Sequence, residues 1–134
     1  MATKVLVDSS IWIAAQDRKS ACFWELSRLL RSAKDEVLTS ELIRLEVSQG
    51  AKNEQIQTLL WQGFEGLKFL ELNAAVYRSA SSNYLRCRKN GITPTTIDCL
   101  LATLARENGV ALWSLDQNLK RMAKVIGFDV HKVK

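Results

Sequence analysis

Four acidic residues could together carry out chemistry: Asp8 and Asp116 follow expected strands, and Glu46 and Asp98 lie on expected helices. Asp8 follows the apolar run 5–7, and Asp116 follows the largely apolar run 110–115. Such runs are typical of strands buried on both faces of a parallel sheet. Ligands bind beyond the carboxyl ends of these strands, so we expect Asp8 and Asp116 to lie together at that edge. The alternative is that each Asp only caps a helix or forms a turn.

The other two acids belong to expected helices. Asp98 falls in the first turn of a helix, where an acid interacts favourably with the helix dipole. The residues after it, 99–105, are almost wholly apolar, and a charged group at the mouth of a buried helix usually needs a partner. Glu46 lies at the boundary of the apolar face of its helix, and a solvent-exposed Glu is the alternative there.

Four carboxylates placed together predict a metal site. Like charges a few ångströms apart raise one another's pKa and oppose folding unless a cation lies among them. Oxygen ligands select hard ions, so Mg²⁺ or Mn²⁺ is the expected cofactor. Such ions activate water for in-line attack on phosphorus, which predicts metal-assisted phosphodiester hydrolysis.

Strands and helices are expected to alternate along the whole chain, which predicts an α/β fold with a mainly parallel central sheet. The expected strands span residues 5–7, 36–39, 68–70, 110–115 and 128–131. The expected helices span residues 11–15, 21–33, 41–51, about 56–64, 74–89, 97–108 and 117–126. No linker or repeat interrupts the pattern, so we expect one domain over residues 1–134.

The composition narrows the class of protein. The 134 residues carry 19 Lys and Arg against 14 Asp and Glu, a net charge of +5 that suits an anionic partner such as nucleic acid. Three widely spaced cysteines, Cys22, Cys87 and Cys99, indicate reduced thiols. No signal peptide or membrane-spanning stretch is expected, which predicts a cytoplasmic protein without a membrane partner.

The sequence gives little support for Ser-His-Asp hydrolysis or for nucleotide binding through a Gly-rich loop. His131 is the only histidine, and no G-x-S-x-G elbow accompanies it, so a Ser-His-Asp hydrolase is not expected. No Gly-rich nucleotide-binding motif occurs. Among the tryptophans, we expect Trp24 and Trp113 in the core, Trp12 against the sheet, and Trp61 at an interface with a partner.

The chain resembles the PIN-domain ribonucleases, and among them the VapC-type toxins of toxin–antitoxin pairs. The resembling segments are VLVDSSIWI around Asp8, SELIRLEV around Glu46, TTIDCLLATLA around Asp98 and ALWSLDQNLKRMA around Asp116. Each segment alone is weakly specific, but their order and spread over nearly the whole chain are characteristic. The resemblance implies a three-layer α/β/α sandwich and Mg²⁺- or Mn²⁺-dependent endonucleolytic cleavage of RNA.

The resemblance also implies roles for single residues. Asp8, Glu46, Asp98 and Asp116 fall on the catalytic, metal-binding acids, and Ser9 falls on a small hydroxyl position that holds a carboxylate or a metal-bound water. Asn118 stands where many relatives carry a further carboxylate, which favours one firmly held ion over two. A homodimer and inhibition by a cognate antitoxin are implied as well.

Two alternatives stay open at this point: a non-catalytic PIN-like module that binds RNA or a partner, and a PIN nuclease of RNA maturation without an antitoxin. Among the basic residues, we expect Arg86 to contact phosphate, because it ends the helix just before the Asp98 segment.

Overall fold

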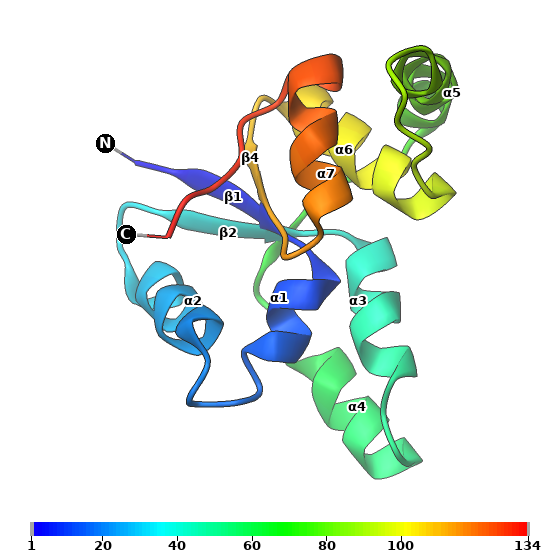
Figure 1. The fold of residues 1–134 in the computed structure, drawn as a ribbon. Coiled ribbons are helices and arrows are strands. Elements are labelled where there is room, and N and C mark those ends of the chain that lie inside the picture. Colours follow the sequence, from blue (N-terminus) through cyan, green and yellow to red (C-terminus); the bar gives the residue numbers. More distant parts are fainter. Residues whose placement is uncertain (1, 134) are drawn as a thin grey trace.

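Helices and strands alternate along the chain in the computed structural model, which describes residues 2–133 (Figure 1). The strands are β1 (Lys4–Val7), β2 (Glu36–Thr39), β3 (Lys68–Phe69) and β4 (Ala111–Trp113). The helices are α1 (Ser9–Ala14), α2 (Ala21–Arg31), α3 (Glu41–Gln49), α4 (Glu54–Gln62), α5 (Ala74–Lys89), α6 (Thr96–Asn108), α7 (Gln117–Met122) and the π-helical turn η1 (Ala123–Gly127).

The four strands form one parallel sheet in the order β3-β2-β1-β4. The chain leaves β1, crosses to β2 and β3 on one side, and returns to β4 on the other side of β1. The strand order therefore reverses at β1, and in open α/β sheets a binding crevice lies at such a point. Asp8 directly follows β1.

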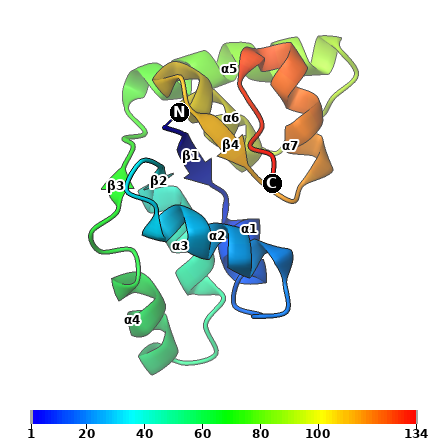
Figure 2. The ribbon, with the colours of Figure 1, turned by 90° about the vertical axis from the view of Figure 1, so that its left-hand side faces the viewer.

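Two layers of helices cover the sheet, as Figures 1 and 2 both show. Alternate strand side chains point to opposite faces. Leu6 and Leu38 join the core that α5, α6 and α7 cover, whereas Val5, Val7 and Val37 join the core under α2. This is the predicted three-layer α/β/α sandwich.

Polar caps define where most helices begin. Each of these side chains accepts a hydrogen bond from a backbone N–H in the first turn of its helix, and they are Ser20, Ser40, Asn53, Asn73 and Thr95. Gly109 ends α6 at a φ of 61°, a left-handed conformation that glycine adopts without steric cost. These local signals explain why most helix starts agree with the sequence-based expectation.

The carboxyl-terminal part departs from that expectation in two places. The strand expected over 110–115 is only β4, because the strand ends at Trp113 and the chain bends at Leu115. The strand expected over 128–131 is reduced to one parallel bridge between Val130 and Leu112. The segment is nevertheless held, since the Leu112 N–H donates to the Asp129 carbonyl and the His131 N–H donates to the Leu112 carbonyl.

Burial corrects one expectation about the tryptophans. Trp113 is buried as predicted, but Trp24 is 62% exposed, on the outer face of α2, and packs only edge-on against Phe23. The thiols of Cys22, Cys87 and Cys99 are free and buried. None of the helices within residues 2–133 is long and apolar enough to cross a membrane.

Candidate active site and the adjacent groove

Asp8 occupies the N-cap position of α1, yet its carboxylate makes no capping hydrogen bond. The side chain turns instead toward β4 and is 7% exposed. Its Oδ2 accepts hydrogen bonds from the hydroxyls of Ser10 and Ser114, each at 2.8 Å. The Ser9 hydroxyl lies 3.5 Å from Oδ1. The plain capping role considered for Asp8 is therefore wrong.

Asp116 follows the end of β4 and does cap its helix. Its Oδ1 accepts the Asn118 N–H at 2.8 Å, and its own N–H donates to the Ser114 hydroxyl at 3.0 Å. One carboxylate oxygen thus stabilises the start of α7, and the other remains for a second partner. Asn118, which stands where many relatives carry a further carboxylate, contributes this backbone N–H to the site.

Asp98 lies in the first turn of α6, close to Asp116. Burial and the negative charges of Asp116 and, more weakly, Asp8 together raise the pKa of Asp98 from its usual 3.8 to about 6. The Thr95 side chain, which accepts the Asp98 N–H at 3.0 Å, partly opposes this rise. Three segments far apart in sequence therefore bring their carboxylates within electrostatic reach of one another.

Glu46 of α3 completes the set. Burial raises the pKa of Glu46, the charge of Asp8 raises it further, the Ser9 hydroxyl lowers it, and Asp98 adds a smaller rise. Its Oε1 is buried and has no hydrogen-bond partner among the described residues. A buried carboxylate oxygen left in this state calls for a water or a cation. Glu46 is thus partly buried rather than fully exposed to solvent.

The donor set of this site fits a hard divalent cation. It consists of carboxylate oxygens, the ligands that Mg²⁺ and Mn²⁺ prefer, and one of them lacks a protein partner. As the side chains stand, no three Asp, Glu, His or Cys residues within residues 2–133 are arranged to hold one ion. The carboxylates face one another, then, without forming a closed coordination shell.

Of the two other residues predicted to act at this site, Ser9 lies in it and Arg86 does not contact its acids. Ser9 interacts with both Asp8 and Glu46, in keeping with the predicted hydroxyl. Arg86 is exposed near the end of α5, and within residues 2–133 it forms no ion pair with an acid of the site.

Ser10 and Ser114, which the sequence did not single out as site residues, make the shortest hydrogen bonds to Asp8. The spacing S-x-D over 114–116 was the signal for Ser114, since Ser commonly bonds to the backbone two residues on.

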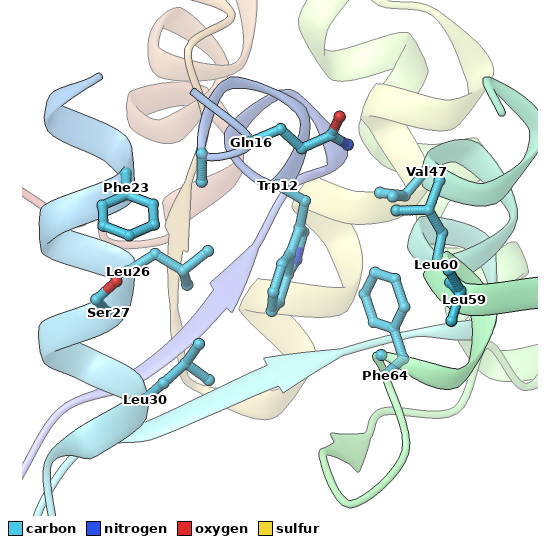
Figure 3. Close-up of a pocket in the computed structure, with 12 residues that line it drawn as sticks. Trp12, Gln16, Phe23, Leu26, Ser27, Leu30, Val47, Leu59, Leu60 and Phe64 are labelled. Atoms are coloured by element: carbon cyan, nitrogen blue, oxygen red, sulfur yellow. The ribbon is translucent and has the colours of Figure 1, made fainter. Parts of the chain in front are cut away.

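An apolar groove lies beside the site, between α2 and α4 (Figure 3). Phe23, Leu26 and Leu30 of α2 line one side. The other side is lined by Val47 of α3, by Leu59 and Leu60 of α4, and by Gly63 and Phe64 just after α4. Trp12 of α1 stands between the two sides. Its ring packs on Phe64 at 5.0 Å, and its indole N–H donates to the Val7 carbonyl at 3.2 Å. Helices α1 and α3 therefore carry residues of both the groove and the carboxylate site.

Comparison with known proteins identifies the family. The family model of the PIN domain matches residues 5–125, a span that includes all four acids. This chain belongs to the PIN-domain family. Its relatives include the VapC ribonuclease Mb1587 of Mycobacterium bovis and ribonuclease VapC11 of Mycobacterium tuberculosis. Each is 29% identical over 124 residues, which cover 90% of this PIN domain and 92% of the relative.

Solved structures share the fold of this PIN domain. VapBC2 from Rickettsia felis, bound to a promoter DNA fragment, has a TM-score of 0.75 at 16% identity and covers 96% of this chain and 98% of that chain. VapC20 of Mycobacterium tuberculosis, described as a sarcin–ricin loop cleaving toxin, has a TM-score of 0.69 at 16% identity, with coverages of 92% and 95%.

Proposed function

We propose that this PIN domain is a Mg²⁺- or Mn²⁺-dependent endoribonuclease that acts as the toxin of a toxin–antitoxin pair. The observation that carries the proposal is the convergence of Asp8, Glu46, Asp98 and Asp116 on one electrostatic cluster. Within residues 2–133, the buried Glu46 Oε1 has no hydrogen-bond partner. The names of its relatives, VapC ribonucleases, supply the substrate class. The net charge of +5 supports an anionic substrate.

Asp8, Asp98 and Asp116 would hold the cation, and Glu46 would bind it directly or through water. A bound Mg²⁺ or Mn²⁺ supplies compensation for the clustered negative charge and activation of water for in-line attack on the phosphodiester. The carboxylates must move closer together to complete such a site. Their negative charges repel one another, and the attraction of each to a cation would overcome this repulsion.

Glu46 is suited to orient the attacking water and accept its proton. Its raised pKa brings the carboxyl nearer to the operating pH, where a general base is most effective. Ser9 restrains the same carboxylate. Arg86 stays a prediction as a phosphate contact, since its exposed position at the end of α5 leaves it free to meet a long substrate.

Substitution of Asp8 tests the proposal. Asp8→Asn keeps the size of the side chain but removes a charge from the cluster, so cleavage of a structured RNA with Mg²⁺ or Mn²⁺ should fall about 100-fold or more. The matched control is Asp17→Asn, because Asp17 is exposed and an amide oxygen can still accept the Lys19 N–H. Wild-type cleavage should also stop in EDTA.

Two outcomes would contradict the proposal. Cleavage that survives in Asp8→Asn or in EDTA would exclude the metal site. A wild-type protein that binds RNA without cutting it would favour the alternative of a non-catalytic binding module.

The groove between α2 and α4 is where we place the antitoxin. Leu30 and Leu59 are 47% and 67% exposed, and an apolar surface of this kind on a free protein usually marks a site for a partner. Structures of VapBC pairs among those similar in fold support a protein partner. A segment in this groove would contact α1 and α3 beside the carboxylates, and a PIN nuclease of RNA maturation would need no such partner.

If the antitoxin occupies the groove between α2 and α4, the predicted homodimer must form through another surface. Leu45 and Tyr77 are each more than half exposed, and they line a hollow together with Leu42, Phe69 and Leu72. We assign the dimer contact to this second apolar surface because it leaves the groove free.

A further inference from the structure

The hydroxyls of Ser10 and Ser114 connect two turns that lie more than one hundred residues apart. Ser10 belongs to the first turn of α1, and Ser114 follows β4. Both donate to the same oxygen, Asp8 Oδ2, at 2.8 Å, and the two hydroxyl oxygens lie 3.4 Å apart. A hydroxyl has one proton to donate, and each of these serines donates it to Asp8.

The same two hydroxyls also accept hydrogen bonds from the backbone just before α7. The Leu115 N–H donates to Ser10 at 3.1 Å, and the Asp116 N–H donates to Ser114 at 3.0 Å. The turn that carries Asp116 is therefore bonded to the groups that hold Asp8. A displacement of either serine affects both acids.

This network leaves one oxygen of each acid for another partner. Asp8 Oδ2 accepts two charge-assisted hydrogen bonds, whereas Oδ1 has only the long contact with Ser9 at 3.5 Å. Asp116 gives Oδ1 to the Asn118 N–H, which leaves Oδ2. In Asp8 and in Asp116, one carboxylate oxygen therefore bonds to neighbouring protein groups, and the other can bind a cation.

We infer that Ser10 and Ser114 are positioning residues for the metal site, and that they present Asp8 Oδ1 to the cation while holding the Asp116 turn in register with it. The inference rests on the proposed function. Without the two hydroxyls, the Asp8 carboxylate is free to rotate, and the turn before α7 loses two of its backbone hydrogen bonds. Hydrogen bonds to a ligating carboxylate commonly change metal affinity 10- to 100-fold.

The test measures Mn²⁺ affinity without catalysis, from the electron paramagnetic resonance signal of free Mn²⁺ in titrations of the purified protein. The Ser10→Ala, Ser114→Ala double variant is expected to raise the Kd for Mn²⁺ about 10-fold or more. Each single variant keeps one donor and should raise it about fivefold, so the single variants decide the matter if the double variant does not fold. Ser114→Thr keeps a hydroxyl and should stay within about twofold of wild type.

Thr39→Val is the matched control. Thr39 is fully buried at the carboxyl end of the neighbouring strand β2, and its hydroxyl has no hydrogen-bond partner within the described chain. The substitution removes a buried hydroxyl of the same kind with little change in shape, and it should leave Mn²⁺ affinity unchanged.

The outcomes separate the inference from the proposed function. If wild type binds Mn²⁺ and cleaves RNA, but folded serine variants bind Mn²⁺ with the wild-type Kd, the positioning role is wrong and the function stands. If Thr39→Val weakens Mn²⁺ as much as the serine variants do, the effect is general loss of buried polarity and the inference is also wrong. A wild-type protein that binds no Mn²⁺ overturns the metal site itself.

Discussion

At the scale of single residues, this PIN domain gathers four negatively charged side chains at one place. Asp98 meets the charges of Asp116 and Asp8, and Glu46 meets those of Asp8 and Asp98. Hydroxyls and backbone N–H groups satisfy part of the set, but no described basic side chain forms an ion pair with any of the four acids. Clustered carboxylates of this kind are a cost to folding that a cation can remove.

The pH dependence of stability should reveal this cost. The pKa of Asp98 is raised from 3.8 to about 6 on folding, so the folded protein holds the proton more tightly than the unfolded chain. The free energy of unfolding contributed by Asp98 therefore falls as the pH rises from 3.8 to about 6. In EDTA, thermal melting should show Asp98→Asn gaining stability relative to wild type over that range.

Divalent ions provide the control for this measurement. Millimolar Mg²⁺ or Mn²⁺ should raise the Tm of wild type near neutral pH, and should raise that of Asp98→Asn less. A difference between the two proteins that is independent of pH, or a wild-type Tm that ignores the ions, would contradict the electrostatic account.

At the scale of elements, the carboxyl-terminal segment is held to α2 by a buried ionic network. His131 Nε2 lies 2.7 Å from Glu25 Oε2, and the Glu25 carboxylate also accepts two hydrogen bonds from Arg28, at 2.7 and 3.1 Å. The His131 ring packs edge-on against Trp113 at 5.2 Å. The only histidine therefore joins a helix on one face of the sheet to the chain beside β4, and it stabilises the fold away from the candidate site.

Removal of this partner should destabilise the protein. Glu25 is 5% exposed, and the hydrogen bonds from Arg28, together with the one from His131, lower its pKa. His131→Ala should lower the free energy of unfolding by about 1–3 kcal/mol, because it takes a partner from a buried carboxylate. Chemical denaturation would measure the loss, and RNA cleavage by the folded fraction should persist. A loss of cleavage without a loss of stability would place His131 in the active site instead.

Acid should weaken the same network. A carboxyl whose pKa is lowered on folding contributes stability that is present above its unfolded value of 4.5 and is lost as the pH falls. Wild type should therefore lose more stability on acidification below that value than Glu25→Gln does. Glu107→Gln, at an exposed position of α6, is the matched control and should follow wild type.

At the scale of the whole molecule, helices α1 and α3 contribute residues both to the groove and to the carboxylate site. Glu46 and Val47 are neighbours on α3, one in the site and the other in the groove. Trp12, two residues after Ser10, reaches from the groove to the carbonyl of Val7, the residue before Asp8. A partner seated in the groove would thus contact the framework of the active site directly.

Substitution in the groove should separate inhibition from catalysis. Leu59 is 67% exposed on α4, a helix without buried residues, so Leu59→Glu should fold and cleave RNA as wild type does. It should weaken inhibition by the proposed antitoxin about tenfold or more, because a charge would be buried in an apolar contact. Gln55→Glu adds the same charge elsewhere on α4 and should leave inhibition intact. Equal inhibition of both variants would place the partner elsewhere.

The sequence by itself determined the alternation of strands and helices, and with it the parallel sheet and the meeting of Asp8 with Asp116 at one edge. These are local properties. A short apolar run, a capping Ser or Thr and a terminal Gly act within a few residues of themselves, so β2, α5 and the start of α6 could be predicted closely from their own segments.

Only the tertiary structure decided which side chains of these elements are covered and which polar groups meet. Trp24 and Leu45 stay more than half exposed because the described residues cover only part of their surface. Glu25 is buried because Arg28 and the distant His131 satisfy its charge. The network of Ser10 and Ser114 forms only once β4 lies beside β1. The physical reason is common to these cases: burial and long-range hydrogen bonds depend on neighbours that the chain acquires after it folds back on itself, and no local pattern records them.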